Sequence, residues 1–157
     1  EETKNTGYGN VNDLVRVRIN GEVVENGYYY VSANLLEDFS KLTKEELANP
    51  PVAKFLASTV DIGSMDPATA KDVEFKFTNE GKRDLIIRSI KSTCGCTAVK
   101  EGGNLTVKPG ESGTIKATFN SGSYKGKVTK AIYVYTNDPK NSEVLLMLNA
   151  DVAGKGQ

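Results

Sequence analysis

Two cysteines separated by one glycine are the most chemically distinctive residues of the sequence. Cys94, Gly95 and Cys96 follow a run of alternating apolar residues that predicts a strand. In an extended strand, residues two apart point to the same side, with their Cα atoms roughly 6.5–7 Å apart, which is the outer limit for a disulfide. Gly95 would let the backbone bend and bring the two sulfur atoms closer, because glycine has no Cβ that could clash.

Three interpretations of this pair are open from the residues alone. The cysteines are small buried apolar residues in a strand with a glycine bulge, or they form a strained disulfide or redox-active pair, or they bind a soft metal. Two thiolates suit Cu(I), whereas zinc usually takes four ligands and would need carboxylates or a second chain. We assign no cofactor and no metal, and keep Cys94, Gly95 and Cys96 as a candidate redox or structural motif.

The composition excludes several classes of function. The sequence contains no histidine, which removes histidine bases, histidine metal ligands and the common Ser-His and Cys-His nucleophile pairs. Lys plus Arg and Asp plus Glu are both 20, so the net charge is zero and the electrostatic signature of a nucleic-acid binder is missing. No apolar run approaches the roughly 18 residues of a membrane span. We therefore expect a protein that is not an enzyme, binds no nucleic acid and has no membrane span.

The residues around the cysteines are predicted to form strands. Apolar and polar residues alternate in short runs separated by turn signals, which is typical of an antiparallel β-sandwich of about seven strands. The runs cover residues 73–77, 85–90, 105–107, 115–119, 128–134 and 144–152. The fold class predicted from this pattern is all-β.

The alternation is interrupted between Lys41 and Pro51. Thr43 followed by Glu46 matches a capping box, so we expect one or two turns of helix over residues 44–48. The predicted organisation is a β-hairpin at residues 1–40, a helical linker at 41–51, a sandwich domain at 52–153 and a tail at 154–157.

The predicted hairpin repeats the end of the predicted domain. Shifted by 117 positions, residues 9–35 align without gaps with residues 126–152, and 5 of the 27 positions are identical, including Gly9 with Gly126 and Val17 with Val134. The apolar alternation also stays in phase. We infer that residues 1–40 are the last two strands of an upstream copy of the same domain, so that the chain is part of a longer tandem protein.

Such a hairpin needs a partner, because a lone two-stranded hairpin is marginally stable in water. We expect its apolar side chains to pack on the intact domain, or on another chain in a swapped or edge-to-edge dimer formed through the residue 1–40 hairpin. The apolar set is Val15, Val17, Ile19, Val31 and Ala33. The expected partner is therefore a neighbouring repeat or another protein.

Four motifs in order between Val60 and Val152 resemble a known family. They are F-x-F-x-N-x-G at 75–81, T-C-G-C-T at 93–97, P-G-E-x-G at 109–113 and T-N-D-P at 136–139. Together they resemble the bacterial domain-of-unknown-function family 1573, of which the Cys-Gly-Cys pair is the hallmark. The resemblance implies an immunoglobulin-like sandwich related to ASH and major-sperm-protein domains, found in envelope or secreted proteins of Bacteroidetes-type bacteria. It implies no established activity.

These observations predict a non-catalytic, extracytoplasmic structural or protein-interaction module. It would be one repeat of a tandem immunoglobulin-like protein located in the periplasm, at the outer membrane or outside the cell. The alternative is a thiol-based redox or Cu(I)-binding role centred on the Cys-Gly-Cys motif.

Overall fold

The computed structural model describes residues 7–95, 97–99 and 105–154 of the chain. The chain divides into two compact units, Glu1–Leu36 and Glu37–Gln157. Glu37, the first residue of the second unit, forms an ion pair with Arg88 of the same unit.

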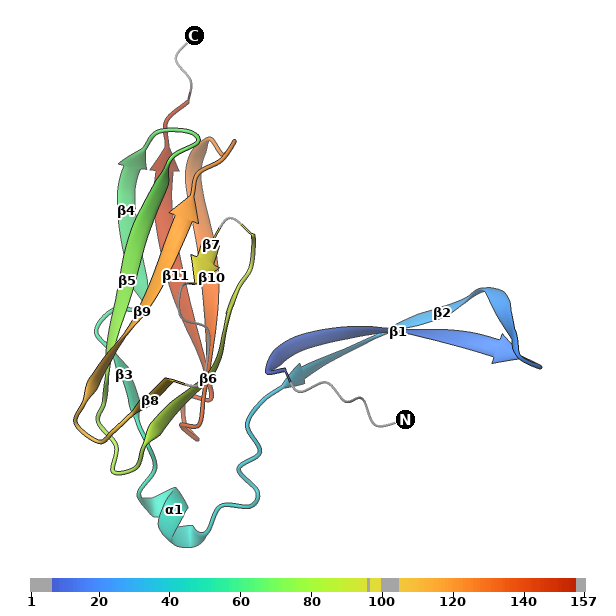
Figure 1. Cartoon of the computed structure of the whole chain (residues 1–157), viewed down its shortest axis with the longest axis horizontal. Coiled ribbons are helices and arrows are strands. Elements are labelled where there is room, and N and C mark those ends of the chain that lie inside the picture. Colours follow the sequence, from blue (N-terminus) through green and yellow to red (C-terminus); the bar gives the residue numbers. More distant parts are fainter. Residues whose placement is uncertain (1–6, 96, 100–104, 155–157) are drawn as a thin grey trace. The chain divides into compact units, whose positions relative to one another are not determined.

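The first unit is an antiparallel hairpin of β1 (Gly9–Ile19) and β2 (Glu22–Leu35), as the sequence predicts (Figure 1). Asn20 and Gly21 form the two-residue turn, both with positive φ (51° and 88°). This conformation is the one that the Asn-Gly pair favours in tight hairpins. The second Asn-Gly pair lies inside β2, opposite a register shift between Arg16 and Arg18.

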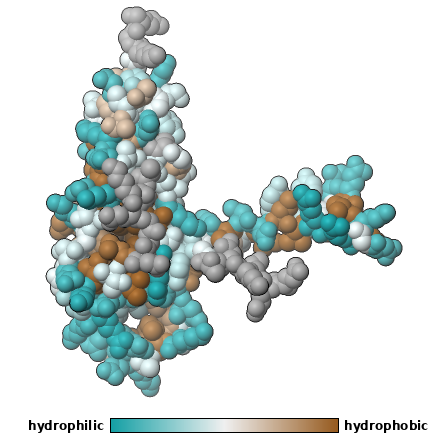
Figure 2. Space-filling model, viewed as in Figure 1, coloured by the Kyte–Doolittle hydropathy of each residue, from teal (hydrophilic) through white to brown (hydrophobic). Residues whose placement is uncertain are grey.

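A two-stranded sheet has no interior, and the hairpin exposes apolar residues along its length. Figure 2 shows them interspersed with polar residues. Large apolar side chains that are at least 39% exposed in this unit are Leu14, Val15, Ile19, Val23, Tyr28, Tyr29, Tyr30 and Val31. The hairpin is therefore a surface that lacks cover within its own unit.

The second unit is an immunoglobulin-like β-sandwich, which confirms the predicted fold class. Its elements are α1 (Lys44–Ala48), β3 (Ala53–Phe55), β4 (Thr59–Met65), β5 (Ala70–Asn79), β6 (Leu85–Ser92), β7 (Thr97–Val99), β8 (Leu105–Val107), β9 (Ser112–Asn120), β10 (Gly126–Thr136) and β11 (Glu143–Val152). One sheet has the order β4-β11-β10-β6-β8 and the other the order β3-β5-β9-β7. The β4–β11 pair is parallel and the other strand pairs are antiparallel.

The core lies between the two sheets and comes from the residues that alternation predicts to face inward. Phe75, Phe77 and Phe119 from one sheet and Ile132 and Leu146 from the other are at most 1% exposed. Period-two spacing places side chains two apart on the same face of a strand, so Phe75 and Phe77 both point into the core. Hydrophobic burial of these side chains stabilises the sandwich.

The described part of the sandwich has more strands than the sequence pattern predicts, partly because one segment serves both sheets. After β3 pairs with β5, the backbone N–H of Leu56 bonds to Lys76, and the chain then crosses to the other sheet. There the Ser58 carbonyl accepts from Met147, and β4 runs beside β11. These pieces are too short and too irregular to show a clear alternation.

The short helix α1 begins as the sequence predicts. The Thr43 hydroxyl accepts from the Glu46 N–H (3.2 Å), and the Glu46 carboxylate accepts from the Thr43 N–H (2.9 Å). Both halves of the capping box are therefore formed. Within the described residues, no helix has the length and apolar character needed to cross a membrane.

Candidate functional site

The candidate cysteine motif lies at a corner where the chain passes from one sheet to the other. Cys94 follows the end of β6 and precedes β7, so it sits in a bend just after the strand that the sequence pattern predicts. Its side chain is half-buried and its sulfur is disulfide-bonded. Cys96 lies outside the described residues.

Hydroxyl groups on both sides fix this corner. The Ser92 hydroxyl donates to the carbonyl oxygens of Cys94 (3.0 Å) and Thr97 (2.8 Å), and the Thr97 N–H donates to the Cys94 carbonyl (3.3 Å). The Thr97 hydroxyl is buried and lies 3.8 Å from the Cys94 sulfur. The corner therefore holds Cys94 in place through its own backbone and brings a hydroxyl close to the sulfur.

The packing of the described residues does not require a glycine at position 95. Among the described residues, no heavy atom lies within 4 Å of a Cβ added to Gly95, and the φ of Gly95 lies outside the left-handed region. The sequence analysis expects Gly95 to let the backbone bend, and the structure places Gly95 in a turn between β6 and β7.

The buried polar side chains of the sandwich are used to hold its turns. They are Asn79, Thr97, Ser121, Thr136 and Asp138, each at most 3% exposed. Among the described residues, no buried side-chain nitrogen or oxygen lacks a hydrogen-bond partner. Such groups are stable in a core because their hydrogen bonds offset the cost of removing them from water.

Asp138 shows how far this bonding reaches. Its carboxylate accepts from the Ala53 N–H (3.0 Å), the Lys140 N–H (2.9 Å) and the Asn141 side-chain amide (2.9 Å). The bond to Ala53 joins the β10–β11 loop to β3, 85 positions earlier in the chain. The T-N-D-P motif is thus a turn, as the sequence suggests, and also a clamp between distant strands.

Asn79 plays a similar role in the F-x-F-x-N-x-G motif. Its side-chain oxygen accepts from the backbone N–H groups of Val52 (3.3 Å) and Gly81 (3.0 Å), and its amide donates to the carbonyls of Arg83 (2.7 Å) and Val107 (2.9 Å). Position 81 also requires glycine for a steric reason, because a Cβ there would overlap the backbone of Pro50 and Pro51. These motif residues therefore fix turns.

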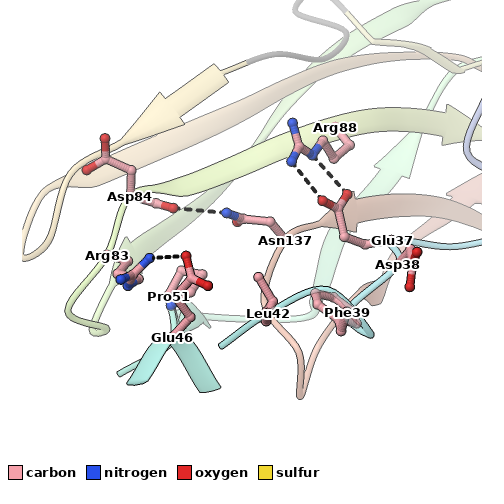
Figure 3. Close-up of a pocket in the computed structure, with 10 residues that line it drawn as sticks. All are labelled: Glu37, Asp38, Phe39, Leu42, Glu46, Pro51, Arg83, Asp84, Arg88 and Asn137. Carbon is pink, nitrogen blue, oxygen red and sulfur yellow. Dashed lines mark hydrogen bonds and ion pairs between the residues drawn. The ribbon is translucent and has the colours of Figure 1, made fainter. Parts of the chain in front are cut away.

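A hollow of about 500 Å³ lies where the segment before β3 meets the sandwich (Figure 3). Its lining residues are Glu37, Asp38, Phe39, Leu42, Glu46, Pro51, Arg83, Asp84, Arg88 and Asn137. The Arg88 guanidinium donates two hydrogen bonds to the Glu37 carboxylate (2.9 and 2.7 Å), and Arg83 lies 2.7 Å from Glu46. Opposite charges thus face each other across the hollow as pairs.

The electrostatics of this hollow follow from those pairs and from the helix cap. The backbone N–H of Thr43 is the main cause that lowers the pKa of the Glu46 carboxyl, and the Thr43 hydroxyl and Arg83 lower it further. The Glu37 and Glu46 carboxylates accept hydrogen bonds from Arg88, Arg83 and Thr43 and so tie the linker and α1 to the sandwich. Sequence reasoning missed the Glu37–Arg88 pair, because 51 positions separate the two residues and no local pattern joins them.

Comparison with known families now identifies the sandwich. Residues 53–152 match the family described as protein of unknown function (DUF1573). The chain belongs to this family. The match covers the strands from β3 to β11, so the hairpin lies outside the DUF1573 domain. No curated protein matches the sequence.

Solved structures share the fold of the DUF1573 domain at low sequence identity. A protein of unknown function from Porphyromonas gingivalis W83 is 17% identical, with a TM-score of 0.66, over 94% of this chain and 68% of its own. The ASH/PapD-like domain 7 of human CEP192 is 11% identical, with a TM-score of 0.56, over 77% of this chain and 99% of its own. The VesB protease of Vibrio cholerae is 12% identical, with a TM-score of 0.51, over 68% of this chain and only 33% of its own.

Proposed function

We propose that this chain is a non-catalytic structural or protein-interaction module and one repeat of a tandem immunoglobulin-like protein. The observation that carries the proposal is the use of the buried polar side chains. Asn79, Ser121, Thr136 and Asp138 bond to backbone groups of their own turns and neighbouring strands, so they stabilise the sandwich rather than converge on a cleft.

The surface of the five-stranded sheet offers this module a place to meet a partner. Tyr133 pairs with Leu145 and Ala131 with Met147 across β10 and β11, on the face opposite the buried Ile132 and Leu146. Leu145 is 44% exposed. Partly exposed apolar groups on a rigid sheet suit protein contacts better than they suit small-molecule chemistry.

An extracytoplasmic location accords with the disulfide at Cys94. Disulfides persist in oxidising compartments such as the periplasm and are rare in the reducing cytosol. The match to the VesB protease covers about a third of that protein, so the fold there is one part of a larger chain. This supports the role of the sandwich as a module of a longer protein. We propose that this module is located in the periplasm, at the outer membrane or outside the cell.

A second candidate function is thiol–disulfide exchange at the Cys-Gly-Cys motif. The half-buried, disulfide-bonded Cys94 in the bend between β6 and β7 favours it. In exchange with glutathione, one thiolate attacks the disulfide, a second glutathione completes the reduction, and two protein thiols and one glutathione disulfide result. Cu(I) binding would require this reduced dithiol form. Equilibration in glutathione buffers distinguishes the candidates, because a structural disulfide resists reduction there and an exchange-active one does not.

Site-specific photo-crosslinking in intact cells tests the interaction role. A photo-reactive residue replaces Leu145 on the five-stranded sheet, and the control replaces Lys116, an exposed residue of β9 on the other sheet. The proposal predicts a discrete protein adduct from position 145 and none from position 116. No discrete adduct from either position would contradict the interaction role.

A further inference from the structure

We propose that the hairpin β1–β2 is the closing strand pair of a second DUF1573 sandwich and that its uncovered face accepts strands equivalent to β5 and β9. This inference deepens the tandem part of the proposed function. The strands come from the polypeptide that precedes Glu1 in the longer protein. The proposal commits to this occupant in preference to a second copy of the 157-residue chain.

The strand register carries the inference. Eight consecutive pairs, from Gly9↔Leu35 to Arg16↔Tyr28, fall under the shift of 117 on the eight pairs from Gly126↔Val152 to Tyr133↔Leu145. Two similar sequences could still pair in different registers, and a slip of one residue would turn every side chain of a strand to the other face. The agreement in register therefore adds to the evidence from sequence similarity. The hairpin therefore pairs as β10–β11 pairs.

Local conformation agrees with the register at two further points. Gly9 and Gly126 begin β1 and β10 with positive φ, 85° and 71°. Ser32 donates to the side chain of Asn12 (2.6 Å), and at the equivalent positions Thr129 donates to the side chain of Asn149 (2.8 Å). The same hydroxyl–amide bridge thus crosses both strand pairs, but the hydroxyl residue lies on β2 in the hairpin and on β10 in the sandwich.

The equivalence identifies the face of the hairpin that needs cover. Val15 and Val31 correspond to Ile132 and Leu148, which are fully buried in the sandwich, yet Val15 and Val31 are 48% and 52% exposed in the hairpin. In the sandwich this face packs against β5 and β9, where Phe75 and Phe119 belong to the same core. A face with this pattern is expected to be covered by strands of the same kind.

The equivalence also identifies the strands that would extend the hairpin at its two edges. In the sandwich, β10 pairs antiparallel with β6, and β11 pairs parallel with β4. The free edge of β1 should therefore accept an antiparallel strand, and that of β2 a parallel one. Supplying these strands removes the open edges that make an isolated hairpin prone to association.

A structural relative supports a longer polypeptide as the source. The match to the Porphyromonas gingivalis protein covers 94% of this chain, more than the second unit alone, so it includes part of the hairpin. That match spans 68% of the relative, whose remaining third lies outside it. The combination of hairpin and sandwich thus has a counterpart within a longer chain.

The test uses the complete gene product, including the residues encoded before Glu1. Val15→Lys places a charge on the face expected to be covered, and Leu14→Lys is the matched control on the opposite face of the same strand, with similar exposure (48% and 39%). The milder pair Val15→Ala and Leu14→Ala serves if Val15→Lys prevents folding of the upstream domain. Thermal unfolding is followed separately for the upstream and downstream domains.

The proposal predicts that Val15→Lys abolishes the upstream transition or lowers its midpoint by at least about 10 °C, on the scale of a buried charge in a small domain. Leu14→Lys should shift it by only a few degrees, and neither variant should move the downstream transition. Equal effects at the two positions, or no strand-forming sequence before Glu1, would overturn the proposal. A stable dimer of the 157-residue chain that buries Val15 would also overturn it. These outcomes are independent of the Leu145 crosslinking result, so either proposal can fail while the other holds.

Discussion

Phe77 and Gly113 face each other across β5 and β9, and this pair gives the sharpest prediction for the core. Phe77 is fully buried, and a Cβ added to Gly113 would lie 2.5 Å from the tip of the Phe77 ring. Gly113→Ala should therefore cost about 1–3 kcal/mol of stability in the wild-type protein, as overpacking does. Phe77→Ala should cost about 3–5 kcal/mol, because it leaves a cavity in the sandwich.

The double variant distinguishes the contact between Phe77 and Gly113 from a general loss of stability. Without the ring, an alanine at position 113 has space and needs no left-handed backbone, so Gly113→Ala should become neutral or stabilising by about 0.4–1 kcal/mol. The two changes should thus be coupled by between about 1 and 4 kcal/mol. Gly95→Ala combined with Phe77→Ala is the control and should be additive within about 0.5 kcal/mol, because no atom of the described residues, Phe77 included, lies within 4 Å of a Cβ on Gly95.

Urea unfolding followed by far-ultraviolet circular dichroism measures these free energies, since the chain has no tryptophan to report by fluorescence. Phe77→Leu replaces Phe77→Ala if the alanine variant is too unstable to give a folded baseline. A cost for Gly113→Ala that is the same with and without the ring would refute this packing of glycine against phenylalanine.

Three further predictions concern the turns and the corner. Asp138→Ala should destabilise the sandwich by about 3–5 kcal/mol in urea unfolding, because it leaves the buried Ala53 N–H and two further donors without their acceptor. A loss below about 1 kcal/mol would contradict the proposed contribution of these hydrogen bonds to stability. Burial, with the Glu143 carboxylate, raises the pKa of Tyr135 to about 12, so the stability that depends on its proton is complete below pH 10 and declines as the pH rises towards 12. Tyr135→Phe should remove this part of the decline in unfolding measured from pH 9 to 12, and an unchanged decline would argue against the burial of the phenol. Gly95→Ala should change stability by no more than about 0.5 kcal/mol, and a larger loss would mean that the corner is closed.

The repeating features of the fold could be predicted from the sequence. Strict alternation at Val73, Phe75 and Phe77 predicts an inward face, and burial at these positions confirms it. The capping box at Thr43 and Glu46 predicts the start of α1, because its two hydrogen bonds are local. Local periodicity and local bonds are visible in a sequence since the interacting residues lie a few positions apart.

Features that depend on distant contacts could not be predicted. The carboxylate of Asp138 reads as a turn residue, and nothing near it in the chain reveals its bond to Ala53. The Glu37–Arg88 pair, which ties the linker to the sandwich, is hidden for the same reason. At the candidate site, the cysteines and the strand before them can be predicted from the sequence, but the path of the chain through the cysteines cannot. The bend after Ser92 arises because the chain changes sheets, which alternation does not encode.

Hydrogen exchange of the β1 and β2 backbone amides compares the 157-residue chain with the complete gene product and tests the central claim most directly. If the hairpin closes a second DUF1573 sandwich, the edge amides that point away from the β1–β2 pairing exchange rapidly in the short chain and are protected in the long one. Rapid exchange of these amides in both proteins would contradict the account.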